Sequence, residues 1–436
     1  MVEPLQFARS WLPKRAKPSE LDATMCRLEM RVHNILVSEY QAGVAPKEGY
    51  LEIPSYYLAE WIAENWWALL FEPRKNDTAN DEQEFLGRHS ILAAQHGFPL
   101  PALSMVSAGK ILHLNVLPRD VPYADMRFTK KAYAFALREE VEHTLTQFVQ
   151  ETVERLNKLE VTGTPLQEAW ALVCATQEDE KEFCALMGML GLSPYDTNPE
   201  IESHMEKVEE RLGARALRDL ALAATEQDFI EAAVEAIQAA DKLNEIAPIS
   251  LVPLSSMHLP EDNLKVQGWQ RGVLAAQKIR QHYKVHAQDP HGGKTVFTNL
   301  SISVDRRANT LEHGVDENKQ LFSAVIAVED DSARMSLLQT ANSRRRFSAA
   351  RATYLAWISD RQGKIGRFVT HAVTRDQQAS RAFAAELLAP IDYIKAQTSG
   401  NKLHYQRVFD LATELGVEPG VVSKQAQNNG IMFAAS

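Results

Sequence analysis

The segment Ala341–Trp357, which reads A-N-S-R-R-R-F-S-A-A-R-A-T-Y-L-A-W, is the part of the sequence on which the interpretation of this chain depends. It opens with the consecutive arginines Arg344–Arg346 and continues into an apolar segment that predicts a helix. Residues four positions apart lie on the same face of a helix, so the side chains of Arg351 and Leu355 are expected to be neighbours.

The segment resembles the active-site helix of the ImmA/IrrE family of zinc metallopeptidases, whose pattern is roughly R-x-R-F-T-x-A-H-E-x-x-H. The frame of that pattern is kept by Arg344, Arg346, Phe347, Ser348 and Ala350. Arg351, Ala352 and Leu355 stand where the family has its first His, its Glu and its second His.

These three replacements remove the chemistry of the family. In the peptidases the two histidines hold one zinc ion, and the Glu activates the water bound to it. Arginine is a permanent cation and cannot ligate a cation, leucine has no donor atom, and alanine cannot accept a proton. The resemblance therefore implies a helix that binds no metal, a protein without catalytic residues, and no cofactor.

A second segment carries the same resemblance. Phe383–Pro390, F-A-A-E-L-L-A-P, matches a box that is specific to the family and follows the arginine-rich helix at the expected distance. In the peptidases a Glu just upstream supplies the third zinc ligand, and this chain has Asp376 in that neighbourhood. The resemblance covers residues 265–436 and implies a zincin-like domain with a small sheet.

Hydrophobic periodicity predicts the other elements of this domain. A helix is expected at Gln267–Tyr283, and strands at Thr295–Val304 and Leu321–Val328. The closing segment Val408–Ile431 predicts two helices joined by a turn, which resembles a helix-turn-helix. Its apolar residues also suit a purely structural role, and both interpretations stay open.

Composition indicates an ordinary globular protein, with 45% hydrophobic and 24% charged residues in 436 positions. No run of about 18 or more apolar residues is present, and the N-terminus lacks an apolar signal core, so we expect neither a membrane partner nor secretion. The cysteines Cys26, Cys174 and Cys184 show no metal-type spacing. They indicate buried thiols in a reducing cytoplasm.

Charge is distributed unevenly along a chain whose net charge is −10, a value that argues against bulk affinity for nucleic acid. Residues 340–381 carry nine basic and two acidic side chains, whereas residues 176–210 carry two basic and ten acidic ones. These segments either meet within the fold, meet a partner, or form separate solvated faces.

Upstream of the resembled domain the sequence predicts a mixed α/β region at 1–125, a helical region at 126–245 and a proline-containing linker at 246–264. The whole chain is thus expected to be α+β and predominantly helical. Helices are predicted near Leu21–Val37 and over Thr129–Leu159, and a β-hairpin at Leu103–Val116 with its turn at Ala108-Gly109.

Two groups of side chains in the first region invite a functional interpretation. Trp61, Trp66 and Trp67 either anchor a core or form a ligand platform. The histidines His89, His96 and His113 do not have the spacing of a metal signature.

The favoured interpretation is a non-catalytic ImmA/IrrE-like protein that binds a protein partner or a small anionic ligand in the former active-site cleft. The resemblance implies a regulatory role in prokaryotic stress responses, toxin–antitoxin systems or phage defence. The residues expected to bind are Arg344, Arg345, Arg346, Arg351, Tyr354, Asp376 and Glu386. Arg351 either binds a carboxylate or phosphate, or it pairs internally with Asp376 or Glu386.

Three alternatives remain. The first is an active zinc peptidase that uses another metal site, for which His371 is a candidate ligand. The second is a DNA-binding regulator that uses the basic stretch and the final helices. The third is a hydrolase of another kind that uses Gly292-Gly293-Lys294-Thr295, which lacks the earlier Gly of a phosphate loop and predicts a turn.

Overall fold

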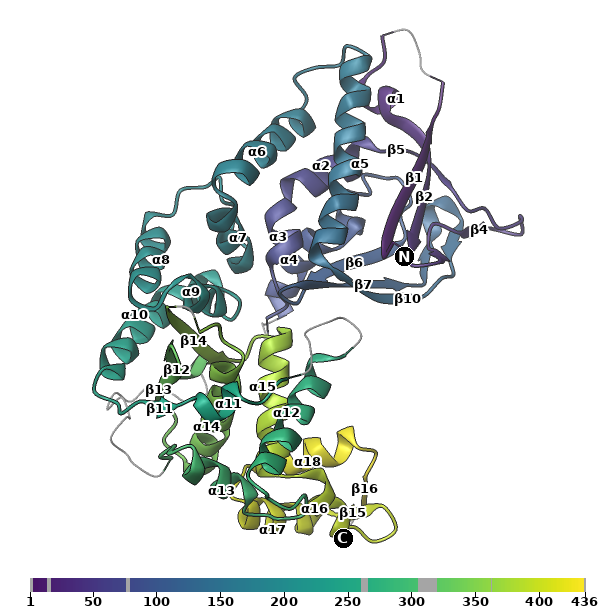
Figure 1. Ribbon diagram of the computed structural model, residues 1–436. Coiled ribbons are helices and arrows are strands. Elements are labelled where there is room, and N and C mark those ends of the chain that lie inside the picture. The colour runs from purple at the N-terminus through teal and green to yellow at the C-terminus, as the bar shows by residue number, and fades with distance from the viewer. Residues whose placement is uncertain are drawn as a thin grey trace. The chain divides into compact units, whose positions relative to one another are not determined.

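The computed structural model describes residues 3–13, 17–75, 79–259, 266–304, 320–361 and 363–434 (Figure 1). The chain forms two compact units, Met1–Thr197 and Asn198–Ser436, which we call the first and the second unit. Both contain helices and strands, and helix predominates, so the expected α+β class is confirmed. None of the described helices is long and apolar enough to cross a membrane.

Antiparallel sheets organise the first unit. In one, β2 (Met25–Val32) pairs with β1 (Leu5–Trp11) on one side and with β3 (Ile35–Leu36) and β5 (Leu51–Pro54) on the other. In another, β7 (Ile111–Leu117) lies between β6 (Ala102–Ser107) and β10 (Ala132–Leu137). A third joins β9 (Met126–Phe128) to β4 (Tyr40–Ala42) and β8 (Arg119–Val121).

The helices of the first unit pack on these sheets and on one another. They are α1 (Glu20–Thr24), α2 (Tyr56–Glu64), α3 (Trp66–Phe71), α4 (Ala79–His89), α5 (Arg138–Lys158), α6 (Pro165–Asp179), α7 (Lys181–Leu190) and the short 3-10 helices η1 (Ile91–Ala94) and η2 (Pro122–Ala124). Trp61, Trp66 and Trp67 are buried on α2 and α3, so they belong to the core and form no exposed ligand platform.

The predicted hairpin at Leu103–Val116 is confirmed. β6 and β7 flank a turn in which Gly109 adopts a φ of 83°, a left-handed conformation that glycine takes without strain. The helix predicted near Leu21–Val37 is wrong beyond Thr24, because the chain continues as β2. Alternate side chains of β2 are buried, which is the pattern of a strand with one face on a core.

The helix predicted over Thr129–Leu159 is wrong in its first part. Residues 132–137 form β10, and the helix α5 starts at Arg138. The alternate residues Ala132, Ala134 and Ala136 face the core, and alanine suits a helix equally well, so the periodicity alone was ambiguous.

Burial of the cysteine thiols is confirmed for Cys26 and Cys184 and wrong for Cys174, which is exposed on α6.

A sheet of order β11-β13-β12-β14 lies at the centre of the second unit. Its strands are β11 (Ile249–Ser250), β13 (Ser332–Leu337), β12 (Phe322–Glu329) and β14 (Lys364–Thr370), and neighbouring strands are antiparallel. α9 (Ala214–Ala221), α10 (Glu226–Leu243) and α14 (Asn342–Trp357) pack against this sheet. The other elements of the unit are α8 (Pro199–Leu212), α11 (Val252–Ser255), α12 (Gly268–His282), α13 (Gly292–Asn299), α15 (Arg375–Leu388), α16 (Ile391–Ala396), β15 (Lys402–His404), α17 (Tyr405–Leu415), α18 (Pro419–Asn428) and β16 (Met432–Ala434).

α15 packs against both α12 and α14 (Figure 1). The contact with α12 is unusually close at Gly272, where an added Cβ would lie 2.0 Å from the carbonyl oxygen of Ala379. The helices predicted for Ala341–Trp357 and Gln267–Tyr283 are confirmed as α14 and α12. The segment Asp376–Pro390, for which no element was predicted, lies mostly in α15. The closing helix pair is confirmed as α17 and α18, and the strand near residues 321–328 as β12.

The strand predicted at Thr295–Val304 is wrong, because its first half lies in the helix α13 and its second half forms no strand. Val296 and Phe297 on α13, and Leu300 directly after it, are buried, and their spacing brings them to one side of a helix. The tetrapeptide Gly292-Gly293-Lys294-Thr295 forms the first turn of α13, so it is helical and not an isolated turn.

The observed division of the chain differs from the predicted one. The predicted linker at 246–264 lies inside the second unit, where β11 pairs with β13, while its residues 260–264 lie outside the described residues. The helices α8–α10, assigned by the sequence to a separate middle region, belong to the same unit as α14. Their packing against the central sheet explains why the chain is not divided at its prolines.

Candidate functional site

The helix α14 carries the sequence that resembles the peptidase helix. It begins after Ala341, and no side chain caps its first turn. Every side chain from Ser348 to Trp357 is buried, so this half of the helix lies in the interior of the unit. Ala352 and Leu355 are fully buried within the apolar core.

Arg351 is buried with only 4% of its surface exposed, and its guanidinium contacts neutral groups. Its Nε donates to Ser380 Oγ at 3.1 Å, and its Nη2 donates to the Thr370 carbonyl at 2.6 Å and to Gln377 Oε1 at 2.8 Å. Burial and the nearby charge of Arg381 hold the pKa of Arg351 well below its ordinary value. The side chain thus joins α14 to β14 and α15 from within the core.

Gln377 organises the groups around this arginine. Its Oε1 also accepts from the Thr370 backbone N–H at 3.2 Å, and its Nε2 donates to the Phe368 carbonyl at 2.7 Å. Both ends of the amide are therefore engaged, one of them with the guanidinium of Arg351. The hydrogen bonds of Gln377 thus hold α14, β14 and α15 together beside Arg351.

Asp376 is not a partner of Arg351. Its Oδ2 accepts from Arg215 at 2.8 Å and from Arg367 at 3.3 Å. Arg367, 2% exposed, also donates to Asp219 Oδ2 at 2.6 Å, so a row of alternating charges joins α9, β14 and α15. Burial alone would lower the pKa of Arg367, but Asp219 and Asp376 raise it.

Glu386 is also engaged elsewhere. Its Oε2 accepts from the Ile391 backbone N–H at 3.3 Å and from Gln425 Nε2 at 3.0 Å. Burial raises the pKa of this carboxyl. The alternative in which Arg351 pairs with Asp376 or Glu386 is therefore wrong. Arg351 does bond within the protein, but its partners are Ser380, Thr370 and Gln377.

The three consecutive arginines have different surroundings. Arg344 is exposed, whereas Arg345 is 3% exposed and donates to the carbonyls of Val304 and Gln339. Arg346 lines a pocket. Tyr354, one turn after Arg351 on α14, is fully buried, so the predicted set does not converge on a single cleft.

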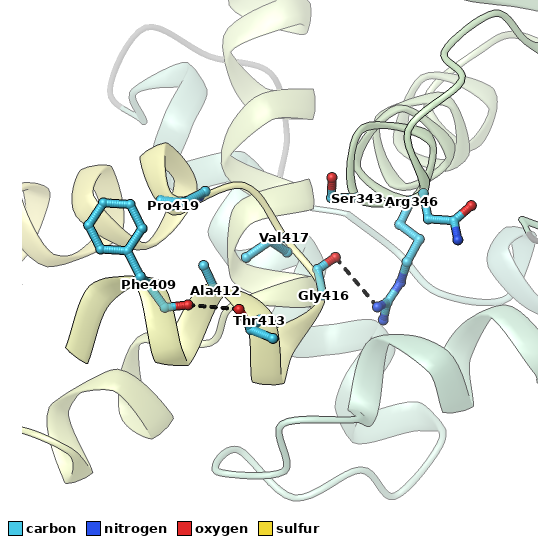
Figure 2. A pocket seen from close by; sticks show the side chains of 9 residues that line it. Ser343, Arg346, Phe409, Ala412, Thr413, Gly416, Val417 and Pro419 are labelled. Carbon is cyan, nitrogen blue, oxygen red and sulfur yellow. Dashed lines mark hydrogen bonds between the residues drawn. The ribbon is translucent and has the colours of Figure 1, made fainter. Parts of the chain in front are cut away.

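The pocket beside Arg346 has a volume of about 270 Å³ and lies between the start of α14 and the pair α17–α18 (Figure 2). Arg346 Nη1 lies 3.5 Å from the Gly416 carbonyl on its far wall. Polar groups come from Arg346, Asn342, Ser343 and Thr413, and apolar ones from Phe409, Ala412, Val417 and Pro419. Phe409 is 47% exposed at its edge, and Ser343 Oγ donates to the neighbouring Glu418.

The histidines considered as metal ligands lie apart. His89 is buried and contacts Glu72 and the Met105 carbonyl, His96 stacks on Tyr57, and His113 lies on the sheet of β6, β7 and β10. Burial and the charges of Arg351 and Arg381 lower the pKa of His371. Within the described ranges no three His, Cys, Asp or Glu side chains form a group able to hold a metal ion.

Sequence reasoning missed most of the pocket. Arg346 was among the expected residues, but Phe409, Thr413 and Gly416 come from α17 and the following turn. The signal that could have found it is the pair of aromatic residues Tyr405 and Phe409, which are four positions apart and lie on the exposed face of this amphipathic helix. Comparison with known protein families, with curated proteins and with solved structures found no match.

Proposed function

We propose that the second unit is a non-catalytic, ImmA/IrrE-like recognition module that binds an anionic group of a partner protein. The regulatory setting that fits the resemblance is a prokaryotic stress response, a toxin–antitoxin system or phage defence. The partner would be bound in the pocket beside Arg346 and not in the position that a metal occupies in the peptidases.

The observation that carries this proposal is the environment of Arg351. At the position that the resemblance assigns to the first ligand histidine, this chain has a cation, held by Ser380, Thr370 and Gln377. A cation at this position repels a metal ion. The neutral partners of Arg351 also make hydrogen bonds of their own, since Gln377 accepts from the Thr370 N–H and Ser380 donates to the Gln377 carbonyl. The replacement is thus built into the core as a structural element.

The pocket supplies the features of an anion site with an apolar wall. The guanidinium of Arg346, which donates to the Gly416 carbonyl, lines the pocket and is a group that suits a carboxylate, and the N-cap residue Ala341 makes no side-chain cap at the start of α14. Val417, Phe409 and Pro419 offer contact surface for an apolar side chain. A chain-terminal carboxylate that follows an apolar residue combines both features.

This proposal is tested by titrating the full-length protein with N-acetyl-leucine while its amide NMR resonances are recorded. We expect saturable shifts in residues 342–346 and 409–419, and no saturation with N-acetyl-leucinamide, which lacks the carboxylate. Arg346→Gln should abolish the shifts, and Arg344→Gln, a control two positions away on the exposed side, should retain them. Equal binding of the amide, or unchanged binding by Arg346→Gln, would exclude the pocket as an anion site.

A DNA-binding regulator is the second candidate, supported by the confirmed helix pair α17–α18. The exposed face of α18 offers Lys424 and Gln427, and a single lysine contributes little phosphate affinity. Arg345, Arg351 and Arg367 of the basic stretch are buried, which weakens this candidate further. Binding to duplex DNA that falls steeply with salt and is lost in Lys424→Glu would favour it over the first.

A further inference from the structure

The second unit has another pocket, which lies at the end of α14. Its volume is about 410 Å³, and it is formed where Trp357, the last residue of α14, meets α11, the segment after α11 and one side of α12. Arg346 and Trp357 stand roughly 16 Å apart along the axis of α14, so this pocket is separate from the one beside Arg346. A pocket of this volume is large enough for a small molecule.

One side of the pocket is apolar and held in place by the core. Leu254, Met257 and Trp357 line it, and all three belong to the buried core of the unit. The Trp357 ring makes an edge contact with Phe383, with centroids 6.4 Å apart. A flat apolar group in the pocket would therefore meet a wall whose side chains are already ordered.

Two guanidinium groups line the same pocket, from Arg271 on α12 and from Arg361 just after α14. Arg361 Nη2 donates to the Trp357 carbonyl at 3.3 Å, whereas its Nη1 is buried and has no hydrogen-bond partner among the described residues. Burial lowers the pKa of Arg361 more than the charge of Asp331 raises it, so the protein does not fully compensate this cation. A buried donor without a partner costs free energy, and a bound anion would remove that cost.

The other polar groups around the pocket are bonded to the protein or lie in water. Ser255 Oγ donates to Asp331 Oδ1 at 2.8 Å, and Ser359 Oγ donates to the Leu355 carbonyl at 2.7 Å. Asp360 is exposed, so water screens its charge.

The balance of charge favours an anion. Lys278 on α12 donates to the carbonyl of His258, which lines the pocket, and so adds a third cation beside Arg271 and Arg361. These three cations outnumber the two nearby carboxylates, Asp331 and Asp360.

We propose that this pocket binds a small organic acid, with its carboxylate or phosphate at Arg361 and a flat apolar group against Met257 and Trp357. The planar fork of a guanidinium suits both kinds of acid. An apolar lining with a few polar groups that fix orientation is the usual composition of a small-molecule site. This site does not depend on the partner-binding role proposed for the pocket beside Arg346.

The same features argue against other ligands. A metal ion or an organic cation would be repelled by the arginines. A neutral apolar molecule would leave Arg361 Nη1 without a partner and would bury it more deeply.

The test is ¹⁹F NMR of the full-length protein labelled with 5-fluorotryptophan, in which the Trp357 signal is identified by its absence in Trp357→Phe. The probes are 2-naphthoate and 2-naphthyl phosphate, and 2-naphthamide is the neutral control. We expect the Trp357 signal to shift saturably with the acids at submillimolar concentration, and the amide to bind at least about 10-fold more weakly. The acid that binds more tightly identifies the acidic group that the pocket prefers.

Arg361→Gln should weaken the binding of either acid about 10-fold or more, the effect of losing a charged hydrogen bond. Asp360→Asn is the matched control at the next position, and it should bind at least as tightly as the wild type because it removes a negative charge. Arg346→Gln should bind as the wild type does, since its pocket is a different one. Circular dichroism checks that each variant is folded, and the comparison of acid with amide needs no variant.

Four results would overturn the proposal. They are no shift of the Trp357 signal at about 5 mM of either acid, equal binding of the amide, unchanged binding by folded Arg361→Gln, and loss of binding in Arg346→Gln. The last would place the probes in the pocket beside Arg346. Loss of anion binding there with the Trp357 response intact would contradict only the proposed partner-binding role.

Discussion

Arg351 is a buried cation whose hydrogen-bond partners are all neutral. Burying a charge costs several kcal/mol, and hydrogen bonds between a charge and a neutral acceptor return roughly 1.5–3 kcal/mol each. The acceptors here have further bonds, since Gln377 Oε1 also accepts from Thr370 N and Ser380 Oγ donates to the Gln377 carbonyl. The net contribution of the charge is therefore small, and the volume that the side chain fills is the larger effect.

Two substitutions at Arg351 separate charge from volume. Arg351→Ala should lower the free energy of unfolding by about 2–4 kcal/mol, because it leaves a cavity. Arg351→Met fills that space without a charge and should cost at least about 1 kcal/mol less. Urea denaturation of both variants measures this, with the exposed Arg344→Ala as a control. An alanine variant as stable as the wild type would show that Arg351 does not fill the core.

Glu72 is a buried carboxyl of the first unit whose pKa lies far from its ordinary value. Burial alone would raise its pKa, but hydrogen bonds from Arg88 and His89 lower it to about 2. A carboxyl whose pKa is lower in the folded state stabilises the fold above its unfolded pKa of about 4.3. That stabilisation is lost as the pH falls from about 4.5 to 2.

Glu72→Gln should therefore destabilise the first unit by about 3 kcal/mol at pH 7, and the difference from the wild type should shrink below pH 4. Tryptophan fluorescence during urea unfolding at several pH values measures this change, because five of the seven tryptophans lie in this unit. Glu52→Gln removes a half-exposed partner of Arg27 and should have little effect at any pH. An equal pH dependence in both variants would contradict the assigned role of Glu72.

At the level of elements, the close approach of α12 and α15 depends on a missing side chain. Gly272→Ala would place a methyl group 2.0 Å from the Ala379 carbonyl oxygen, so the helices must separate. We expect a loss of about 2–3 kcal/mol, typical of overpacking. Gly420→Ala on α18 meets no atom within 4 Å and should change the stability of the same unit by less than about 1 kcal/mol. Differential scanning calorimetry measures the melting temperature of both variants. Equal melting temperatures would contradict the close packing of α12 against α15 at Gly272.

The sequence predicted the elements whose apolar residues follow a single period. The helical period of α12 was sufficient, because its buried residues recur on one face of the helix. It failed where a strand runs directly into a helix, as β10 does into α5, because alanine fits both periods. The resemblance assigned Arg346 to the former active-site cleft, whereas the side chain lines a different pocket against α17 and α18. The sequence also could not show that Asp376 bonds to Arg215 and Arg367.

At the level of the whole molecule, the boundary between the two units lies between Thr197 and Asn198 because the helices that follow it pack into the core of the second unit. Gly366 on β14 lies so close to the Leu212 carbonyl that an added Cβ would be 2.3 Å away, and Arg367 is paired with Asp219 on α9. The helices α8 and α9 therefore complete the core of the domain that carries α14, although they precede the prolines near residue 253.

Shortened chains test this division. A chain of residues 198–436 should fold cooperatively, whereas a chain of residues 265–436 should lack β11 and the helices on β14 and should remain unfolded or aggregate. Dispersed amide resonances and a single sharp melting transition identify the folded chain. A shorter chain that folds as well as the longer one would favour the boundary at 246–264 instead.

The metal content of the full-length protein tests the central claim most directly. We expect plasma mass spectrometry of untagged, extensively dialysed protein, produced in zinc-supplemented medium, to find well below one zinc ion per chain. Arg351 and Leu355 would then stand as structural replacements of the ligands in α14. One zinc ion per chain, retained through dialysis, would contradict the proposed non-catalytic module and reopen proteolysis.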